Sequence, residues 1–230
     1  MNWLLRGLMV LGGAILVYQG LPVMRASWQA QKADAVVMKV RRGEAVTLPE
    51  VNAGMAALNR AVAANPVAGR YLQRSELEAA AGLMQSLKLS EAERLALMKQ
   101  SRADLELGLA RAPARSIDWL RLAVMREAID GPGRNVLTPF FMSLETGRNI
   151  EPIWRVTLHV IVNNWAYFSD AQKAELQTYV TTMWRYTSDQ RMFATTVNNP
   201  IDELIIRNLL KDVPGAQENL TKWILLNQKS

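Results

Sequence analysis

The longest apolar stretch of the chain lies near its N-terminus, where residues Gly7 to Met24 carry no charge and one strongly polar side chain, Gln19. A helix rises about 1.5 Å per residue and a hydrocarbon core of about 30 Å needs roughly 20 apolar residues, so this run is long enough to span a bilayer. A cleaved signal peptide would have a shorter apolar region ending at a small-x-small site, and a buried core helix would show a polar face. The pattern therefore predicts a transmembrane anchor over residues 1–24.

Aromatic and cationic residues flank this run on both sides. Trp3 and Trp28 lie at its two ends, with Arg6 and Arg25 just inside them. Tryptophan is enriched at membrane interfaces, and arginine near a helix end extends its charged group toward the headgroups. These flanks support the anchor and predict a contact with anionic lipid near Arg25.

The segment after the anchor has the features of a helix that continues into water. Residues 25–43 contain no proline and no glycine until Gly43, which follows Arg41 and Arg42. Cations in a last turn followed by glycine mark a helix C-terminus. We expect a juxtamembrane stalk helix over residues 25–43, bent near Pro22 because a proline ring does not fit an undistorted helix.

Beyond residue 43 the apolar positions recur with helical spacing. Capping boxes predict helix starts, and Pro- or Gly-containing segments predict helix ends. The starts are Thr47–Glu50, Ser90–Glu93 and Ser169–Gln172, and the ends include Asn65-Pro66, Ala112-Pro113 and Gly131-Pro132-Gly133. No stretch shows sustained strand alternation. The sequence predicts an all-α helical domain over residues 44–230, with repeat-like hairpins in 44–130 and a C-terminal helical lobe in 134–230.

Two parts of the hairpin region resemble each other. The segment from Leu58 to Pro66 aligns with the segment from Leu105 to Pro113, 47 residues later, and a large apolar residue follows each proline by six residues, Leu72 and Trp119. Helical hairpins repeated in this way are typical of tetratricopeptide-like proteins, although the regular period is about 34 residues. We interpret the pattern as a degenerate tetratricopeptide-like repeat; two ordinary antiparallel hairpins are the alternative.

The positive charge of the chain is concentrated near the predicted anchor. The formal net charge is +6, but residues 1–42 alone hold six cations against Asp34, so the remainder is nearly neutral. A juxtamembrane basic segment suits anionic lipid headgroups. This distribution argues against nucleic acid as a partner.

The chain contains no cysteine. Disulfides, thiolate metal sites and cysteine catalysis are thereby excluded, and the composition suits an oxidising compartment. Cations after the span would place the domain in the cytoplasm by the positive-inside rule, but most of them lie far along the stalk. A short charged N-terminus ahead of an uncleaved apolar run is the usual form of a signal anchor. We expect a single-pass protein of the bacterial inner membrane with a periplasmic domain.

Candidate chemistry is sparse. His159 is the only histidine and lies beside an apolar helical stripe, which favours a structural, hydrogen-bonded role. Glu145 and Glu151 could meet as an acid/base pair, although a solvated pair is the simpler interpretation. An aromatic set could stack sugars but at helical spacing is first a core: Trp154, Trp165, Tyr167, Phe168, Tyr179, Trp184 and Tyr186. No metal-binding, nucleotide-binding or hydrolase motif is present, so we predict no catalytic, cofactor-binding or metal-binding residues and no cofactor.

Several short motifs resemble one family. They are Leu109-Ala-Arg-Ala-Pro-Ala-Arg-Ser-Ile-Asp-Trp119, Ser143-Leu-Glu-Thr-Gly147, Glu151, Arg155 and Met183-Trp-Arg185. Together with the anchor and Pro-closed hairpins, the chain looks like the membrane-anchored helical proteins encoded with bacterial exopolysaccharide genes, the VpsP-like polysaccharide biosynthesis type. The resemblance implies an accessory or scaffold role in making or exporting surface polysaccharide, and it carries over no active-site residues.

These features predict a non-enzymatic, single-span scaffold that contacts other membrane or envelope proteins of a polysaccharide assembly. The first alternative is an accessory subunit of another large membrane complex, such as a respiratory, photosynthetic or secretion assembly. A helical carbohydrate-active enzyme using Glu145 and Glu151 is a further alternative.

Overall fold

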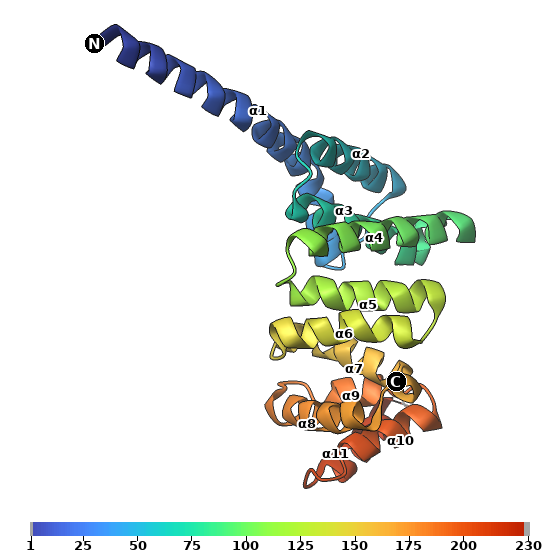
Figure 1. Cartoon of the computed structure of the whole chain (residues 1–230). Coiled ribbons are helices and arrows are strands. Elements are labelled where there is room, and N and C mark those ends of the chain that lie inside the picture. The colour runs from blue at the N-terminus through green and yellow to red at the C-terminus, as the bar shows by residue number, and fades with distance from the viewer. Residues whose placement is uncertain (1, 228–230) are drawn as a thin grey trace. The chain divides into compact units, whose positions relative to one another are not determined.

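The computed structural model describes residues 2–227, apart from the side chains of residues 2 and 4–6. The predicted position of the Arg6 side chain and the polar tail beyond Asn227 lie outside the described residues. Every regular element between residues 2 and 227 is a helix, which confirms the all-α prediction (Figure 1). The chain divides into two compact units, Met1–Ala114 and Arg115–Ser230.

Helix α1 (Asn2–Arg41) begins the first unit and passes through Pro22 without interruption. Its first half extends beyond the other helices of the unit (Figure 1). Among the described residues, the helix segment Gly7–Arg41 contains a window that is long and apolar enough to cross a membrane, and none of that window is buried. The structure is therefore consistent with an N-terminal membrane anchor, and a signal sequence would meet the same criterion.

Three further α-helices complete the first unit: α2 (Leu48–Ala64), α3 (Ala68–Leu83) and α4 (Glu91–Arg111), with the short 3-10 helix η1 (Gln85–Leu87) after α3. Both predicted capping boxes form. The Thr47 hydroxyl accepts from the Glu50 amide, and the Ser90 hydroxyl accepts from the Glu93 amide. Each satisfies a backbone donor that the first helical turn leaves unpaired.

Contacts between side chains show how these helices pair. Lys39 of α1 binds Glu50 at the start of α2, and Arg60 near the end of α2 binds Gln29. Helices α1 and α2 are therefore antiparallel. Helices α3 and α4 are antiparallel as well, because Arg94 at the start of α4 donates to the carbonyl of Gly82 at the end of α3.

The second half of α1 differs from the expected stalk in water. Ala26, Ala30 and Ala33 are buried, and Val36 and Val37 lie in the same core. A Cβ placed on Gly54 of α2 would lie 2.6 Å from the Val36 Cγ1, so the two helices approach closely at this glycine. Residues 26–41 thus form the first helix of the helical unit, and the sequence-based boundary at residue 43 is displaced.

The second unit contains α5–α11 and two further 3-10 helices. Their bounds are α5 (Ser116–Asp130), α6 (Arg134–Gly147), η2 (Glu151–Ile153), α7 (Trp154–Asn163), η3 (Trp165–Tyr167), α8 (Asp170–Tyr186), α9 (Arg191–Thr195), α10 (Pro200–Leu209) and α11 (Ala216–Asn227). The Ser169 capping box opens α8 as predicted. One continuous core joins these helices and includes Phe140, Leu158, Ile161, Leu176, Met183, Phe193, Ile206 and Leu220.

The division of the chain also differs from the predicted one at residues 130–134. Gly131-Pro132-Gly133 is a short turn inside an antiparallel pair, because Arg126 of α5 donates to the carbonyl of Asn135 at the start of α6. Gly131 has φ +82°, a conformation that glycine adopts without strain. Helix α5 therefore belongs to the C-terminal unit, and the units divide between Ala114 and Arg115.

Candidate functional site

A shallow apolar groove lies in the second unit where the α5–α6 turn, the end of α7 and the start of α10 meet. Its volume is about 360 Å³. The lining residues are mostly apolar: Pro132, Val162, Asn163, Trp165, Ala166, Asn199, Ile201, Asp202 and Ile205. We call this feature the Trp165 groove.

One wall of the Trp165 groove is fixed by a polar network around Glu127 of α5. Its two carboxylate oxygens accept from the side-chain amides of Asn163 at 2.6 Å and Asn164 at 2.7 Å. The buried Asn164 also accepts from the backbone amide of Gly133 at 2.9 Å. These bonds tie the α5–α6 turn to the end of α7 and hold Pro132 beside the groove.

The other wall is the start of α10, whose direction is set by Asn199. The Asn199 side chain accepts from the amides of Ile201 and Asp202, and the Asp202 carboxylate accepts from the Asn198 amide. Asparagine at an N-cap satisfies amides that have no partner within the helix. The cap thereby fixes the residue at which α10 begins.

The outward side of α10 begins with two exposed apolar residues, and the exposed Asn208 follows them one turn later. Ile201 is 69% exposed and Leu204 is 68% exposed, whereas Ile205 and Ile206 pack into the core. A surface helix normally carries polar residues opposite its buried face. An exposed apolar ridge beside a groove is typical of a protein-binding surface.

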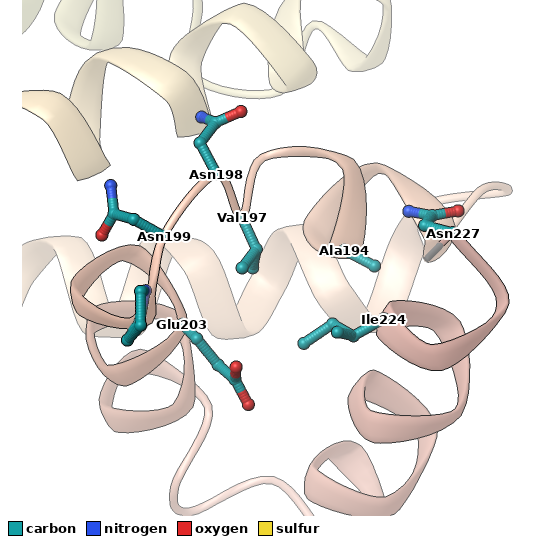
Figure 2. Close-up of a pocket in the computed structure, with 8 residues that line it drawn as sticks. Ala194, Val197, Asn198, Asn199, Glu203, Ile224 and Asn227 are labelled. Carbon is teal, nitrogen blue, oxygen red and sulfur yellow. The ribbon is translucent and has the colours of Figure 1, made fainter. Parts of the chain in front are cut away.

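A second pocket of about 380 Å³ lies on the opposite edge of α10, between α9 and α11 (Figure 2). Val197, Ile224 and Glu203 are directed toward it, whereas Asn198 and Asn199 point away (Figure 2). The Glu203 carboxylate is held by Arg207 at 2.7 Å. The pocket therefore offers one paired carboxylate over an apolar floor and no aromatic platform among its lining residues, which is a poor arrangement for stacking a sugar ring.

His159 lies on the exposed side of α7. Its Nε2 is 2.9 Å from the Asn163 side-chain nitrogen and 4.0 Å from a Glu127 oxygen. The histidine thus belongs to the edge of the Glu127 network, in agreement with the hydrogen-bonded role expected from the sequence. Among the residues the structure describes, no cluster of three or more His, Cys, Asp or Glu side chains could hold a metal ion.

The partner that the structure gives Glu151 is Ser188, not Glu145. The Glu151 carboxylate accepts from the backbone amide and the hydroxyl of Ser188, both at 2.8 Å. These hydrogen bonds lower the pKa of Glu151 below its ordinary value, which disfavours the protonated form that a general acid needs. Glu145 is exposed on α6.

The aromatic set divides between core and surface. Trp154, Phe168, Tyr179 and Trp184 are buried, and Trp165 is half-buried in the groove wall. Only Tyr167 and Tyr186 of the set are exposed. The core interpretation is therefore confirmed for Trp154 and Trp184.

A buried charged cluster in the first unit was not anticipated from the sequence. Arg74 of α3 donates to both Asp104 oxygens of α4, at 2.5 and 2.6 Å, and to the Asn59 side chain of α2 at 2.8 Å. Glu78 lies one turn away, with an oxygen 3.7 Å from the Arg74 Nε. Burial and the nearby Asp104 carboxylate raise the pKa of Glu78 to about 8.

The cluster joins three helices and is enclosed by them. Glu78 and Asp104 are almost completely buried, so a substrate has no direct access to either carboxylate. The Arg74–Asp104 pair connects α3 to α4, and the Asn59 contact connects α3 to α2. The sequence did contain one signal, an acidic residue next to a core leucine on two of these helices: Glu78 beside Leu77 on α3 and Asp104 beside Leu105 on α4.

Comparison with known proteins gives no match: no family model, no curated protein and no solved structure is similar to this chain. The candidate function therefore depends on the residues and geometry described above.

Proposed function

We propose that this protein is a non-enzymatic, single-span scaffold of the bacterial inner membrane that contacts protein partners of an envelope polysaccharide biosynthesis or export assembly. The observation that carries the proposal is the combination of an unburied apolar half of α1 with a helical unit built on the other half of the same helix. Because one continuous helix belongs to both parts, the helical unit is held at the membrane surface.

The helical units support a scaffold role through their construction from antiparallel pairs. Helices α1–α2, α3–α4 and α5–α6 each form such a pair within its own unit. The two similar segments lie in corresponding places: residues 58–66 contain the end of α2 and residues 105–113 the end of α4, and each helix is the second of its antiparallel pair. This correspondence supports a degenerate tetratricopeptide-like origin, and such repeats commonly bind protein partners.

The surface proposed for the partner is the Trp165 groove together with Ile201 and Leu204 of α10. It combines an apolar ridge with neighbouring polar groups that can form hydrogen bonds. Protein interfaces have the same composition, with an apolar centre and a polar rim. The resemblance to VpsP-like proteins supports a partner from a polysaccharide assembly. The periplasmic side is the expected location of this unit.

The alternative is an accessory subunit of a different large membrane complex, which the same anchor and helical units would suit. Affinity purification of the full-length chain in mild detergent distinguishes the two. We expect polysaccharide synthase or export components to co-purify with the parent protein and to be lost from an Ile201→Ser/Leu204→Ser variant. An Ile117→Ser variant, which removes an exposed apolar residue from α5, is the control and should retain them.

Recovery of respiratory, photosynthetic or secretion subunits in place of polysaccharide components would favour the alternative. Equal retention by all three proteins would show that the α10 ridge is not the partner surface.

A further inference from the structure

An open pocket of about 520 Å³ lies at the point where α1 leaves the apolar run. One wall is a single side of α1, formed by Met24, Ser27, Trp28, Gln31 and Asp34, and the other is Arg70 of α3. The positions on α1 are spaced three or four residues apart, so they lie along one face.

Arg70 is fixed at a defined height along α1. Its guanidinium donates to the Ser27 hydroxyl at 3.1 Å. Ser27 follows Met24, the end of the apolar run, by three residues, so it lies about 4.5 Å further along the helix axis. The headgroup layer occupies roughly 5–7 Å on each side of the hydrocarbon core. When residues 7–24 span the bilayer, the guanidinium therefore lies at the depth of the lipid phosphates.

Trp28 and Met24 offer the apolar contacts that a bound lipid would need. Trp28 is 65% exposed and Met24 is 58% exposed, so neither side chain is used in packing the unit. An interfacial tryptophan packs against the region between headgroup and acyl chain, and Met24 offers an apolar surface one turn nearer the hydrocarbon core.

The charges around the pocket favour an anionic headgroup. Arg25 precedes Ser27 by two residues, about 3 Å along the helix axis, and Arg70 lies within the pocket. The acidic residue in the lining is Asp34, whose carboxylate accepts from Gln73 at 2.9 Å about two turns above Ser27. Cations therefore predominate at the height of the phosphates.

We propose that this pocket binds one anionic phospholipid, with its phosphodiester on Arg70 and its glycerol and first acyl carbons against Trp28 and Met24. The proposal rests on the membrane anchor of the proposed function. A guanidinium suits this role because it presents two parallel donors to phosphate oxygens. The bound lipid would hold the helical unit at a fixed height and orientation above the bilayer.

Native mass spectrometry of the full-length protein in mild detergent, titrated with phosphatidylglycerol or phosphatidylcholine, tests the proposal. We expect one phosphatidylglycerol to bind in preference to phosphatidylcholine, and Arg70→Gln to weaken its binding about tenfold, the loss expected for one charge-assisted contact. The matched control is Arg60→Gln, which removes a cation bonded to α1 at Gln29 but outside the pocket, and it should bind like the parent protein.

Three results of the lipid titration would overturn the proposal. They are equal binding of the two lipids, equal losses in the Arg70 and Arg60 variants, or displacement of the lipid by millimolar inorganic phosphate, which would indicate a general anion site. Membrane fractionation of the same variants separates this inference from the proposed function. An Arg70→Gln protein that remains in the membrane but loses the lipid supports the pocket, whereas a parent protein that leaves the membrane contradicts the anchor and the pocket together.

Discussion

The guanidinium of Arg74 holds the carboxylate of Asp104 with two hydrogen bonds, at 2.5 and 2.6 Å, in the interior of the first unit. Glu78 lies beside this pair, and burial together with the Asp104 charge raises its pKa to about 8 from an ordinary value of 4.5. One cation, one carboxylate and one protonated carboxyl group form a cluster without net charge. This balance leaves no uncompensated charge in a site that excludes water.

The free energy of unfolding should consequently fall as the pH rises, because of Glu78. An unfolded chain loses the Glu78 proton near pH 4.5, whereas the folded chain keeps it to about pH 8. Because the unfolded state binds fewer protons in that interval, the Glu78 contribution to the free energy of unfolding falls by about 1 kcal/mol per pH unit and levels off above it. Glu78→Gln should remove this slope and make the variant more stable than the parent at pH 8.

Urea unfolding of the detergent-solubilised protein across that pH interval measures the effect. Glu76→Gln is the control on the same helix, where Glu76 is in an ion pair with Arg41, and it should keep the parent slope. A Glu78→Gln variant with the parent slope would show that Glu78 is ionised in the folded protein.

The packing of α1 against α2 predicts opposite effects for two glycine substitutions. A Cβ at Gly54 would lie 2.6 Å from the Val36 Cγ1 and 2.9 Å from the Leu77 Cδ2, whereas a Cβ at Gly69 meets nothing within 4 Å. Gly54→Ala should therefore destabilise the first unit by about 1–3 kcal/mol. Gly69→Ala should be neutral or slightly stabilising because alanine favours a helix. Equal stability of the two variants, measured by thermal unfolding, would mean that residues 26–41 are not part of the core.

Trp184 is expected to contribute chiefly to the stability of the second unit. It is buried, and its ring centroid lies 4.9 Å from that of Phe193 in an edge-to-face arrangement. Trp184→Ala should lower the free energy of unfolding by about 3–5 kcal/mol, and Trp154→Ala by a similar amount. Tyr186→Ala, two residues later and 75% exposed, should melt like the parent. A Trp184→Ala protein that also melts like the parent would support a ligand-binding role for this tryptophan.

The orientation of the chain in the membrane can be tested by thiol labelling, since the native chain contains no cysteine. We expect a cysteine at Tyr186, or at Ser230 beyond the described residues, to react with an impermeant reagent in cells with a permeabilised outer membrane and an intact inner membrane. Labelling only after lysis would place the helical units in the cytoplasm.

The sequence was informative where local chemistry determines local structure. The boxes at Thr47, Ser90 and Ser169 form because a hydroxyl and an acidic or amide side chain three residues apart satisfy the first free amides of a helix. Helix α5 begins without such a box, since Arg115 occupies the N-cap and Ser116 is buried in the first turn. The helix α9 was not predicted, since its five residues are too few to show a helical period.

Features that depend on long-range packing were less predictable. The predicted stalk has an apolar face made largely of alanine, which resembles an ordinary soluble helix until its contacts with α2 are known. The Arg74–Asp104 pair joins residues 30 positions apart, and the Trp165 groove combines residues from 132 to 205. Neither arrangement has a local sequence pattern.

We propose that α1 is an anchor in its first half and a structural helix in its second. Membrane fractionation of protein lacking residues 1–24 tests it most directly, because the unburied apolar window is the feature that requires a bilayer. We expect this protein to be soluble after a high-salt wash and to keep its helical content by circular dichroism, because residues 26–41 still complete the core. Truncated protein that stays with the membranes after the wash, or that is unfolded, would contradict it.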